Sequence, residues 1–169
     1  MAYEQHVKSA SEIAARCAIV TLSDTRTAQT DTSGTKIREL LEADGHQIVS
    51  YQIVPDDPEK FGALLDELLS NPQLDVVLTN GGTGISRRDR TIEVIEQRLE
   101  NMLVGFGELF RMLSWEQIGS GAMLSRAVAG IARGKIIFSM PGSTKAVELA
   151  MTKLILPELR HVLFELRKP

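Results

Sequence analysis

Apolar residues along this chain fall into two alternating patterns. Short apolar runs rich in β-branched residues, the pattern of strands buried in a parallel sheet, occur at residues 16–22, 74–78 and 135–140, with a partly alternating run at 46–54. Apolar residues at helical spacing lie between these runs, and the predicted helices are 31–44, 59–69, 91–96, 104–129, 146–153 and 156–166. Strands that alternate with helices in this way are typical of an α/β domain with a mostly parallel sheet.

Length and composition fit one globular domain. The 169 residues are 43% hydrophobic and 24% charged, which is ordinary for a soluble protein, and we expect an N-terminal arm at residues 1–15 and a single domain at 16–169. The net charge of −3 argues against a general nucleic-acid binder. No run of about 18 apolar residues exists and the polar start lacks the apolar core of a signal peptide, so we expect a cytoplasmic protein that does not enter a membrane.

The stretch from Leu74 to Thr91 carries the most specific signal in the chain. Its apolar run breaks into Thr79-Asn80-Gly81-Gly82-Thr83-Gly84, where glycines let the backbone turn sharply and expose its amides. Arg87, Arg88 and Asp89 follow and supply phosphate-compatible cations and a candidate metal carboxylate. The string is neither a P-loop nor a GxGxxG dinucleotide motif. Judged by the glycines alone, a tight turn between strand and helix is about as good an interpretation as an anion site. The charged residues that follow the glycines favour the anion site.

Polar residues also follow the other predicted strands. The strand at 16–22 runs into Ser23-Asp24-Thr25-Arg26-Thr27, the strand at 46–54 into Pro55-Asp56-Asp57-Pro58, and the strand at 135–140 into Pro141-Gly142-Ser143. Open α/β sheets bind their ligands at the carboxyl ends of their strands, so we expect these loops to face the same crevice as the glycine loop. The competing interpretation is that the aspartates and Ser143 are helix caps.

These motifs together resemble those of the MoaB/MogA family of molybdenum cofactor biosynthesis proteins. The resemblance rests on residues 54–57, 81–89 and 139–143, and on 107–114 with 118–127, which are similar to the MoaB side of the family. It spans roughly residues 17–165 and implies a three-layer, Rossmann-like α/β domain that forms homotrimers or homohexamers. It also implies binding of molybdopterin and, as in the active members, adenylylation of its terminal phosphate by ATP with magnesium, releasing pyrophosphate.

The resemblance also assigns roles to particular residues. The functional aspartates of the family fall on Asp56 and Asp89, and we expect these to act in catalysis and to bind Mg²⁺, which typically takes one or two carboxylates. The residues expected to bind the substrates molybdopterin and ATP are Ser23, Asp24, Gly81, Gly82, Thr83, Gly84, Arg87, Arg88, Ser139, Pro141, Gly142 and Ser143. A phosphate nucleophile, with a second pKa of about 6, needs no general base, which suits a chain with one cysteine and scattered histidines.

Two other functions stay open at this point. One is a non-catalytic member of the family that binds molybdopterin or acts as a scaffold, with other proteins of the pathway as candidate partners. The other is an unrelated nucleotide-dependent enzyme on a Rossmann-like sheet, although no GxGxxG follows the first strand. Apolar residues of the segment 104–129 favour core and subunit packing over a cofactor site, and the largest of them are Phe106, Phe110, Met112, Trp115 and Met123.

Overall fold

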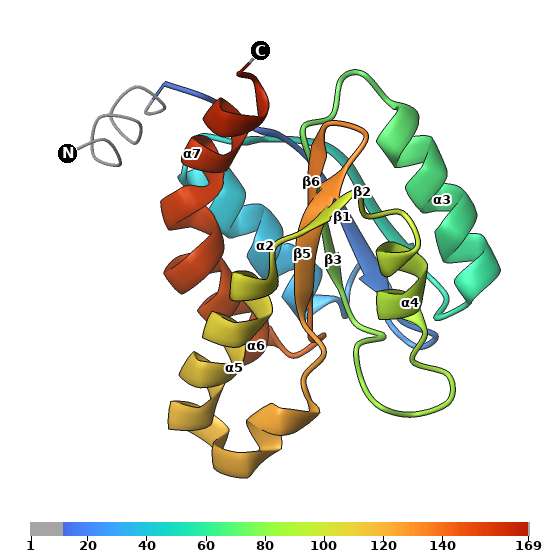
Figure 1. The fold of residues 1–169 in the computed structure, drawn as a ribbon. Coiled ribbons are helices and arrows are strands. Elements are labelled where there is room, and N and C mark those ends of the chain that lie inside the picture. Colours follow the sequence, from blue (N-terminus) through green and yellow to red (C-terminus); the bar gives the residue numbers. More distant parts are fainter. Residues whose placement is uncertain (1–11, 169) are drawn as a thin grey trace.

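A six-stranded sheet in the order β2-β1-β3-β6-β5-β4 forms the centre of the domain (Figure 1). The computed structural model describes residues 12–168, so most of the predicted arm at 1–15 lies outside the described residues. Neighbouring strands are parallel from β2 to β6, and β5 and β4 complete the sheet in antiparallel pairing. The strands are β1 Arg16–Leu22, β2 Gln47–Val54, β3 Val76–Asn80, β4 Asn101–Met102, β5 Val128–Ala132 and β6 Lys135–Met140.

Helices cover both faces of this sheet and confirm the expected three-layer architecture (Figure 1). Alternate residues of β1 separate two cores, because Cys17 and Ile19 face one layer and Ala18 and Val20 face the other. The helices of the first layer are α2 Thr32–Ala43, α5 Val104–Ile118, α6 Thr144–Ala150 and α7 Leu156–Leu166, and those of the second are α3 Pro58–Ser70 and α4 Thr91–Glu96. No helix within residues 12–168 is long and apolar enough to span a lipid bilayer.

The prediction of one helical region at 104–129 is wrong in its second half. Helix α5 ends at Ile118, its C-cap Gly119 has a φ of +60°, and a 3₁₀ helix, η1, follows at Gly119–Leu124. The next apolar residues form β5, which returns into β6 through the two-residue turn Arg133-Gly134 with φ values of 49° and 70°. Positive φ at both positions is the geometry of a tight β-hairpin. The small apolar residues of β5 fit a helix as well as a strand, so only the turn distinguishes them.

The C-terminal helices, predicted as two, form one continuous rod in which a π-helical segment, η2 Met151–Ile155, separates α6 from α7. Pro157 stands in the first turn of α7. Proline has no N–H to donate to the preceding turn, and the π-helical segment lies directly before this break in the α-helical bonding.

His46 is a buried polar residue that joins the start of β1 to α7. Its Nδ1 accepts a hydrogen bond from the Ala15 N–H at 3.0 Å, while its Nε2 lies 3.0 Å from Asp44 Oδ2 and 3.4 Å from Arg160 Nη1. Because Nδ1 is an acceptor, the neutral ring carries its proton on Nε2 and donates it to Asp44. Burial and the Arg160 charge lower the pKa of His46, against the opposing effect of Asp44.

We expect the free energy of unfolding to fall as the pH drops below about 6.5, the ordinary pKa of an unfolded histidine. The unfolded imidazole takes up a proton there that folded His46 resists, so the folded state loses stability down to its own, lower pKa. Urea unfolding of the wild type and of His46→Gln between about pH 7 and pH 5 measures this, because the variant lacks the contribution. His161→Gln is the control and should keep it; identical pH dependences of wild type and His46→Gln would contradict the assignment.

Candidate functional site

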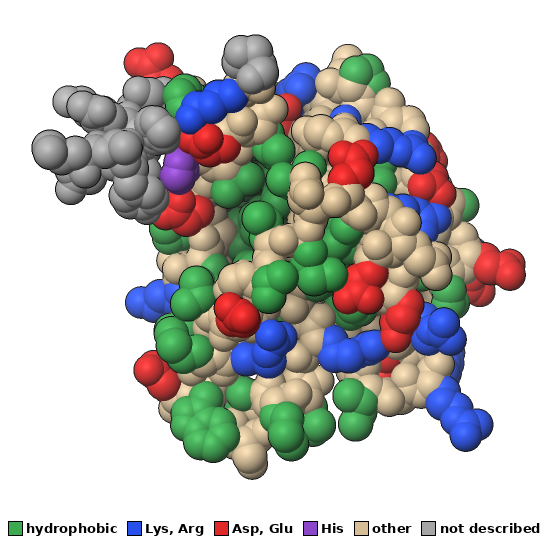
Figure 2. Space-filling model, in the orientation of Figure 1, with side chains coloured by type: hydrophobic (Ala, Val, Ile, Leu, Met, Phe, Trp, Pro, Cys, Tyr) green, Lys and Arg blue, Asp and Glu red, His purple; other side chains and the backbone are tan. Residues whose placement is uncertain are grey.

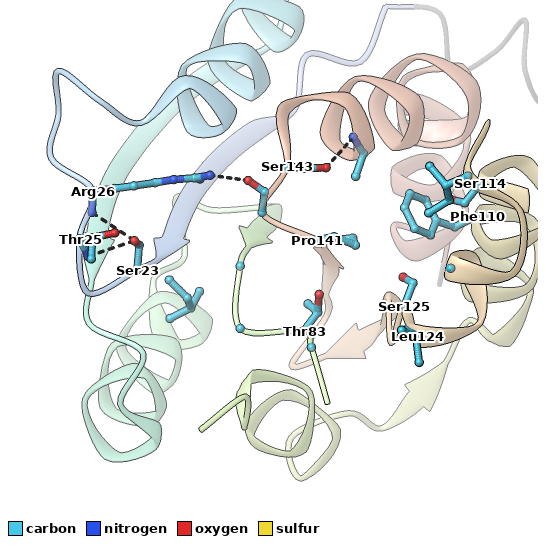
Figure 3. A pocket seen from close by; sticks show the side chains of 18 residues that line it. Ser23, Thr25, Arg26, Thr83, Phe110, Ser114, Leu124, Ser125, Pro141 and Ser143 are labelled. Atoms are coloured by element: carbon cyan, nitrogen blue, oxygen red, sulfur yellow. Dashed lines mark hydrogen bonds between the residues drawn. The ribbon is translucent and has the colours of Figure 1, made fainter. Parts of the chain in front are cut away.

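Loops after β1, β3 and β6 meet at the carboxyl edge of the sheet and enclose a cavity of about 590 Å³. Figure 3 shows Ser23, Thr25 and Arg26 on one side, Phe110, Ser114, Leu124 and Ser125 on the other, and Thr83, Pro141 and Ser143 between them. The first side is polar, whereas Phe110, Ile118 and Leu124 make the wall from α5 and η1 largely apolar. The crevice expected at this edge is therefore present, and one wall comes from a helix that no loop motif indicated.

Close backbone packing requires the glycines of the central loop. Gly81 has a φ of +97° and Gly82 a φ of +62°, conformations that side chains rarely adopt. A Cβ atom on Gly81 would lie 2.2 Å from the Leu22 carbonyl oxygen, and one on Gly82 would lie 2.0 Å from Thr91 Oγ1. The Gly81 N–H also donates to the Met140 carbonyl at 3.2 Å. The loop is thus wedged between the ends of β1 and β6, with Gly81, Gly82, Thr83 and Gly84 all lining the cavity.

The two predicted catalytic aspartates flank this loop from its outer side. Asp56 Oδ1 lies 2.9 Å from the position of a Cβ on Gly82, and Asp89 Oδ2 lies 2.8 Å from that of a Cβ on Gly84. Neither aspartate lines the 590 Å³ cavity; Asp89 lines a neighbouring one of about 470 Å³ instead. The aspartates therefore lie beside two glycines of the cavity wall, although they are far apart in the sequence.

Helix capping does not explain Asp56 or Asp89. Asp57, not Asp56, caps α3, because Asp57 Oδ1 accepts from the N–H groups of Glu59 and Lys60 at 3.0 and 2.9 Å. The cap position of α4 is Arg90, without a side-chain cap bond, and Asp89 Oδ2 accepts from the Ser86 N–H at 2.9 Å. The cap interpretation is correct for Ser143, whose Oγ accepts from the N–H of Ala146 in α6 at 3.2 Å.

The donor set around Asp56 fits a hard divalent cation. Burial and the negative charges of Asp89 and Asp24 raise the pKa of Asp56, with Arg88 opposing them. A cation beside such a carboxylate relieves the unfavourable burial and repulsion. No group of three or more His, Cys, Asp or Glu residues that could hold a metal ion lies within residues 12–168. A pair of carboxylates is the number that Mg²⁺ typically takes from a protein, with phosphate and water oxygens completing its shell.

The remaining predicted site residues differ in where they lie. Ser23 lines the cavity and holds its own loop, since its Oγ accepts from the N–H groups of Thr25 and Arg26 at 3.3 and 3.1 Å. Asp24 accepts from the Asp56 N–H at 3.2 Å and from the Arg88 guanidinium at 2.5 Å. Pro141, Gly142 and Ser143 line the cavity as expected, but Arg87, Arg88 and Asp24 do not.

Ser139 is also placed away from the cavity. It is fully buried in β6, opposite Thr79 of β3, and its Oγ has no hydrogen-bond partner among the described residues. Ser139 was predicted to bind a substrate, but its side chain does not reach the 590 Å³ cavity.

Arg26 belongs to a loop that was expected at the crevice but was not among the predicted site residues, and it links several loops of the cavity. Its Nη2 donates to the Gly142 carbonyl at 2.6 Å (Figure 3), and its Nη1 contacts Asp31, Ser33 and Asn80. Asp31 also caps α2, because its Oδ1 accepts from the Gly34 N–H at 3.0 Å. Burial would raise the pKa of Asp31, but hydrogen bonds from Thr21, Tyr51, Gly34 and Ser33 outweigh it and lower the pKa. The ionised Asp31 therefore stabilises the guanidinium at the cavity wall.

Arg126 was missed as well, although its segment belongs to a motif that supported the family resemblance. It precedes β5 and donates to the backbone carbonyls of Thr83 and Asp89 and to the Glu93 carboxylate. Nothing in its neighbouring residues indicates this contact, because its partners are 33 to 43 residues away.

We expect Asp89→Asn to lower the pKa of Asp56 toward its ordinary value of about 3.9, because the substitution removes a neighbouring negative charge. Burial remains in the variant, so part of the elevation should stay. Carboxyl ¹³C NMR titration of Asp56 measures the change. Asp66→Asn, which removes a carboxylate paired with Arg98, is the control and should leave the Asp56 pKa where it is. An Asp56 titration unaffected by Asp89→Asn would show that the two carboxylates do not interact.

The family described as "Probable molybdopterin binding domain" matches residues 18–161. Molybdenum cofactor biosynthesis protein B of Bacillus cereus is 54% identical over 169 residues, which cover 99% of each chain. The protein of the same name from Bacillus subtilis is 48% identical, also over 99% of each chain.

Solved structures agree with the sequence comparisons. A crystal structure of Molybdenum cofactor biosynthesis protein B, with 55% sequence identity, superposes with a TM-score of 0.90 and covers 93% of this chain and 98% of that one. The tungsten cofactor synthesizing protein MoaB from Pyrococcus furiosus is 39% identical, with a TM-score of 0.83 and coverage of 92% and 98%. The chain belongs to the MoaB/MogA family of molybdenum cofactor biosynthesis proteins.

Proposed function

We propose that this protein adenylylates molybdopterin with Mg-ATP and releases pyrophosphate. The observation that carries the proposal is the placement of Asp56 and Asp89 beside Gly82 and Gly84 of the cavity wall. The relatives' names, which refer to molybdenum cofactor biosynthesis, support the pathway, and family membership removes the alternative of an unrelated Rossmann-like enzyme.

The reaction needs little proton transfer from the protein. The terminal phosphate of molybdopterin is largely ionised near neutral pH, since the second pKa of a phosphate monoester is about 6. Its oxygen attacks the α-phosphorus of ATP, a new P–O–P bond forms, and the bond to pyrophosphate breaks. None of the described residues that line the 590 Å³ cavity is a histidine or a cysteine. The cavity residues are thus suited to a reaction without a side-chain base or nucleophile.

The obstacle in such a reaction is the repulsion between anions, and polar groups of the cavity wall address it. Backbone amides of Gly82, Thr83 and Gly84 and of the turn Gly142-Ser143 would provide donors for phosphate oxygens. Asp56 and Asp89 would hold Mg²⁺, which neutralises charge on the phosphates and on the leaving pyrophosphate. The apolar wall of Phe110, Ile118 and Leu124 offers a surface for the flat ring system of a substrate.

A non-catalytic member that only binds molybdopterin is the remaining alternative. Both aspartates are present and neither caps a helix, which favours the enzyme. Pyrophosphate release on mixing the protein with molybdopterin, ATP and magnesium tests the proposal directly. Binding of molybdopterin without pyrophosphate release would support the non-catalytic alternative.

Asp89→Asn should lower the rate of pyrophosphate release by about 10²–10³-fold, the typical cost of losing one electrostatic contact to the transition state. Binding of molybdopterin should stay the same or tighten, because the variant has one negative charge fewer beside an anionic ligand. Single-turnover assays and direct binding on the same protein separate the two effects.

Asp57→Asn is the matched control for this variant. Asp57 caps α3 and neighbours Asp56 in the sequence, and asparagine caps a helix about as well as aspartate, so this variant should keep near-normal stability and near-normal turnover. A near-normal turnover of Asp89→Asn would contradict the role of Asp89.

We also propose that the protein is a homotrimer or homohexamer. Phe106 and Phe110, which the sequence suggested for subunit packing, are buried in the core. Other apolar residues of α5 and η1 are exposed, and hydrophobic side chains gather at the lower left of Figure 2, the region of α5 in Figure 1. Those that do not line the 590 Å³ cavity are Val104, Leu109, Met112, Trp115 and Met123. A patch of this kind usually marks a protein interface.

Sedimentation velocity at micromolar concentration should therefore give a trimer or hexamer. Trp115→Glu should shift the protein toward smaller species, because it places a charge among apolar residues of the proposed interface. Val49→Glu changes an apolar residue that is exposed on β2, away from this patch, and should not affect assembly. A folded wild-type monomer at this concentration would contradict the proposal.

A further inference from the structure

The segment that carries Asp89 has mostly local hydrogen bonds of its own. The Asp89 N–H donates to the Ser86 carbonyl at 3.1 Å, and the Ser86 N–H donates to Asp89 Oδ2 at 2.9 Å. Ile85, which precedes them, is 70% exposed. These bonds define the conformation of residues 84–89, but they do not hold the segment in a particular position relative to the sheet. Arg88 of this segment also binds Asp24, but both side chains are exposed and such pairs contribute little stability. The position of the Asp89 carboxylate therefore depends mainly on contacts at the two ends of the segment.

Arg126 makes such contacts at both ends. Its Nε donates to the Thr83 carbonyl at 3.3 Å, and its Nη2 donates to the Asp89 carbonyl at 2.6 Å. Its Nη1 donates to Glu93 Oε1 in α4 at 2.6 Å. One planar guanidinium thus joins the glycine loop, the aspartate segment and the following helix. Hydrogen bonds from a charged donor are stronger than neutral ones, and only arginine offers several donors in a rigid fork.

Glu93 and β5 hold Arg126 itself in place. The Arg126 guanidinium lowers the pKa of Glu93 in spite of the burial that would raise it, so this pair is ionised at neutral pH. Arg126 also directly precedes Ala127 and the first residue of β5, Val128, both of which are buried. The guanidinium is therefore anchored on the sheet side and on the helix side.

We propose that Arg126 is a positioning residue for the adenylyl transfer proposed above, on which this inference rests. It holds the carbonyls on either side of residues 84–88 and thereby fixes the Asp89 carboxylate beside Gly84. Its Nε, Nη1 and Nη2 atoms all donate to protein acceptors, namely the carbonyls of Thr83 and Asp89 and the Glu93 carboxylate, so it acts through Asp89 and not on the substrates. In an active site, a displacement of about 1 Å can cost about 10²-fold in rate.

Arg98 provides a matched control for Arg126. Its guanidinium also binds one carboxylate, that of Asp66 at 2.9 and 2.7 Å, and two backbone carbonyls, those of Val94 at 2.9 Å and Gly62 at 3.2 Å. The two arginine side chains are similarly exposed, 21% for Arg98 and 29% for Arg126. Arg98 joins α3 to α4 and has no contact with the Asp89 segment. Removing either arginine should therefore cost similar stability, whereas only Arg126 should affect Asp89.

The test compares Arg126→Ala, Arg126→Lys and Arg98→Ala by thermal unfolding, by amide hydrogen exchange at Ser86 and Asp89, and by the Mg²⁺ concentration that gives half-maximal pyrophosphate release. We expect Arg126→Ala to speed exchange at both amides by about tenfold or more, and to raise the Mg²⁺ requirement. Arg126→Lys, which keeps the charge but not the fork, should restore only part of either property. Arg98→Ala should match the wild type in both.

Exchange at Ser86 and Asp89 that is as slow in Arg126→Ala as in Arg98→Ala would overturn the positioning role, whatever the activity. Faster exchange with an unchanged Mg²⁺ requirement would also overturn it, since the freed segment would then not matter to the reaction. If the wild type releases no pyrophosphate, the proposed function fails, while the exchange comparison and the change in direct Mg²⁺ binding still decide whether Arg126 positions Asp89.

Discussion

The arrangement of this site depends on one steric constraint, the contact between the Gly81 backbone and the end of β1. The strands β1, β3 and β6 are in register up to their carboxyl ends, where Asn80 pairs with Thr21 on one side and with Met140 on the other. The chain leaving β3 must therefore pass directly over the Leu22 carbonyl, at a distance that leaves no room for a side chain. Because the loop after β3 lies so close to the end of the sheet, the loops after β1 and β6 line the same cavity.

The close packing around the glycine loop also affects the ionisation of the aspartates beside it. Asp56 and Asp89 both lie against the glycine loop, and burial together with the negative charges of Asp89 and Asp24 raises the pKa of Asp56. A raised pKa means that the ionised carboxylate is less stable in the folded protein than in water. A cation bound beside such a carboxylate would relieve this energy, which is why the arrangement is consistent with the proposed magnesium site. Asp31 is the opposite case, since its hydrogen bonds lower its pKa and stabilise its negative charge without a bound ligand.

The sequence predicted the parallel strands, most helices and the loops of the site, because each of these has a local signal. A buried strand needs a run of apolar residues, and a strand end with glycines or aspartates is visible in the residues themselves. The strand β5 was missed because Val128–Ala132 consists of apolar residues, mostly small, that suit a helix as well. Its identity is decided by the turn at Arg133-Gly134 and by pairing with β6, which is a tertiary contact. Ser139 was placed in the site because it belongs to a familiar motif, yet its position in β6 turns its side chain into the core.

Arg26 and Arg126 were missed for a different reason, which concerns their acceptors. Arg26 binds the carbonyl of Gly142, and Arg126 binds those of Thr83 and Asp89. Every residue has a backbone carbonyl, so no residue type marks the receiving end of such a bond, and the partners are 116, 43 and 37 residues apart. Yet loops need this kind of support, because their own hydrogen bonds set their shape and not their position. The groups expected to contact the ligands are thus carried by loops with recognisable motifs, while distant arginines with no local signal fix where those loops stand.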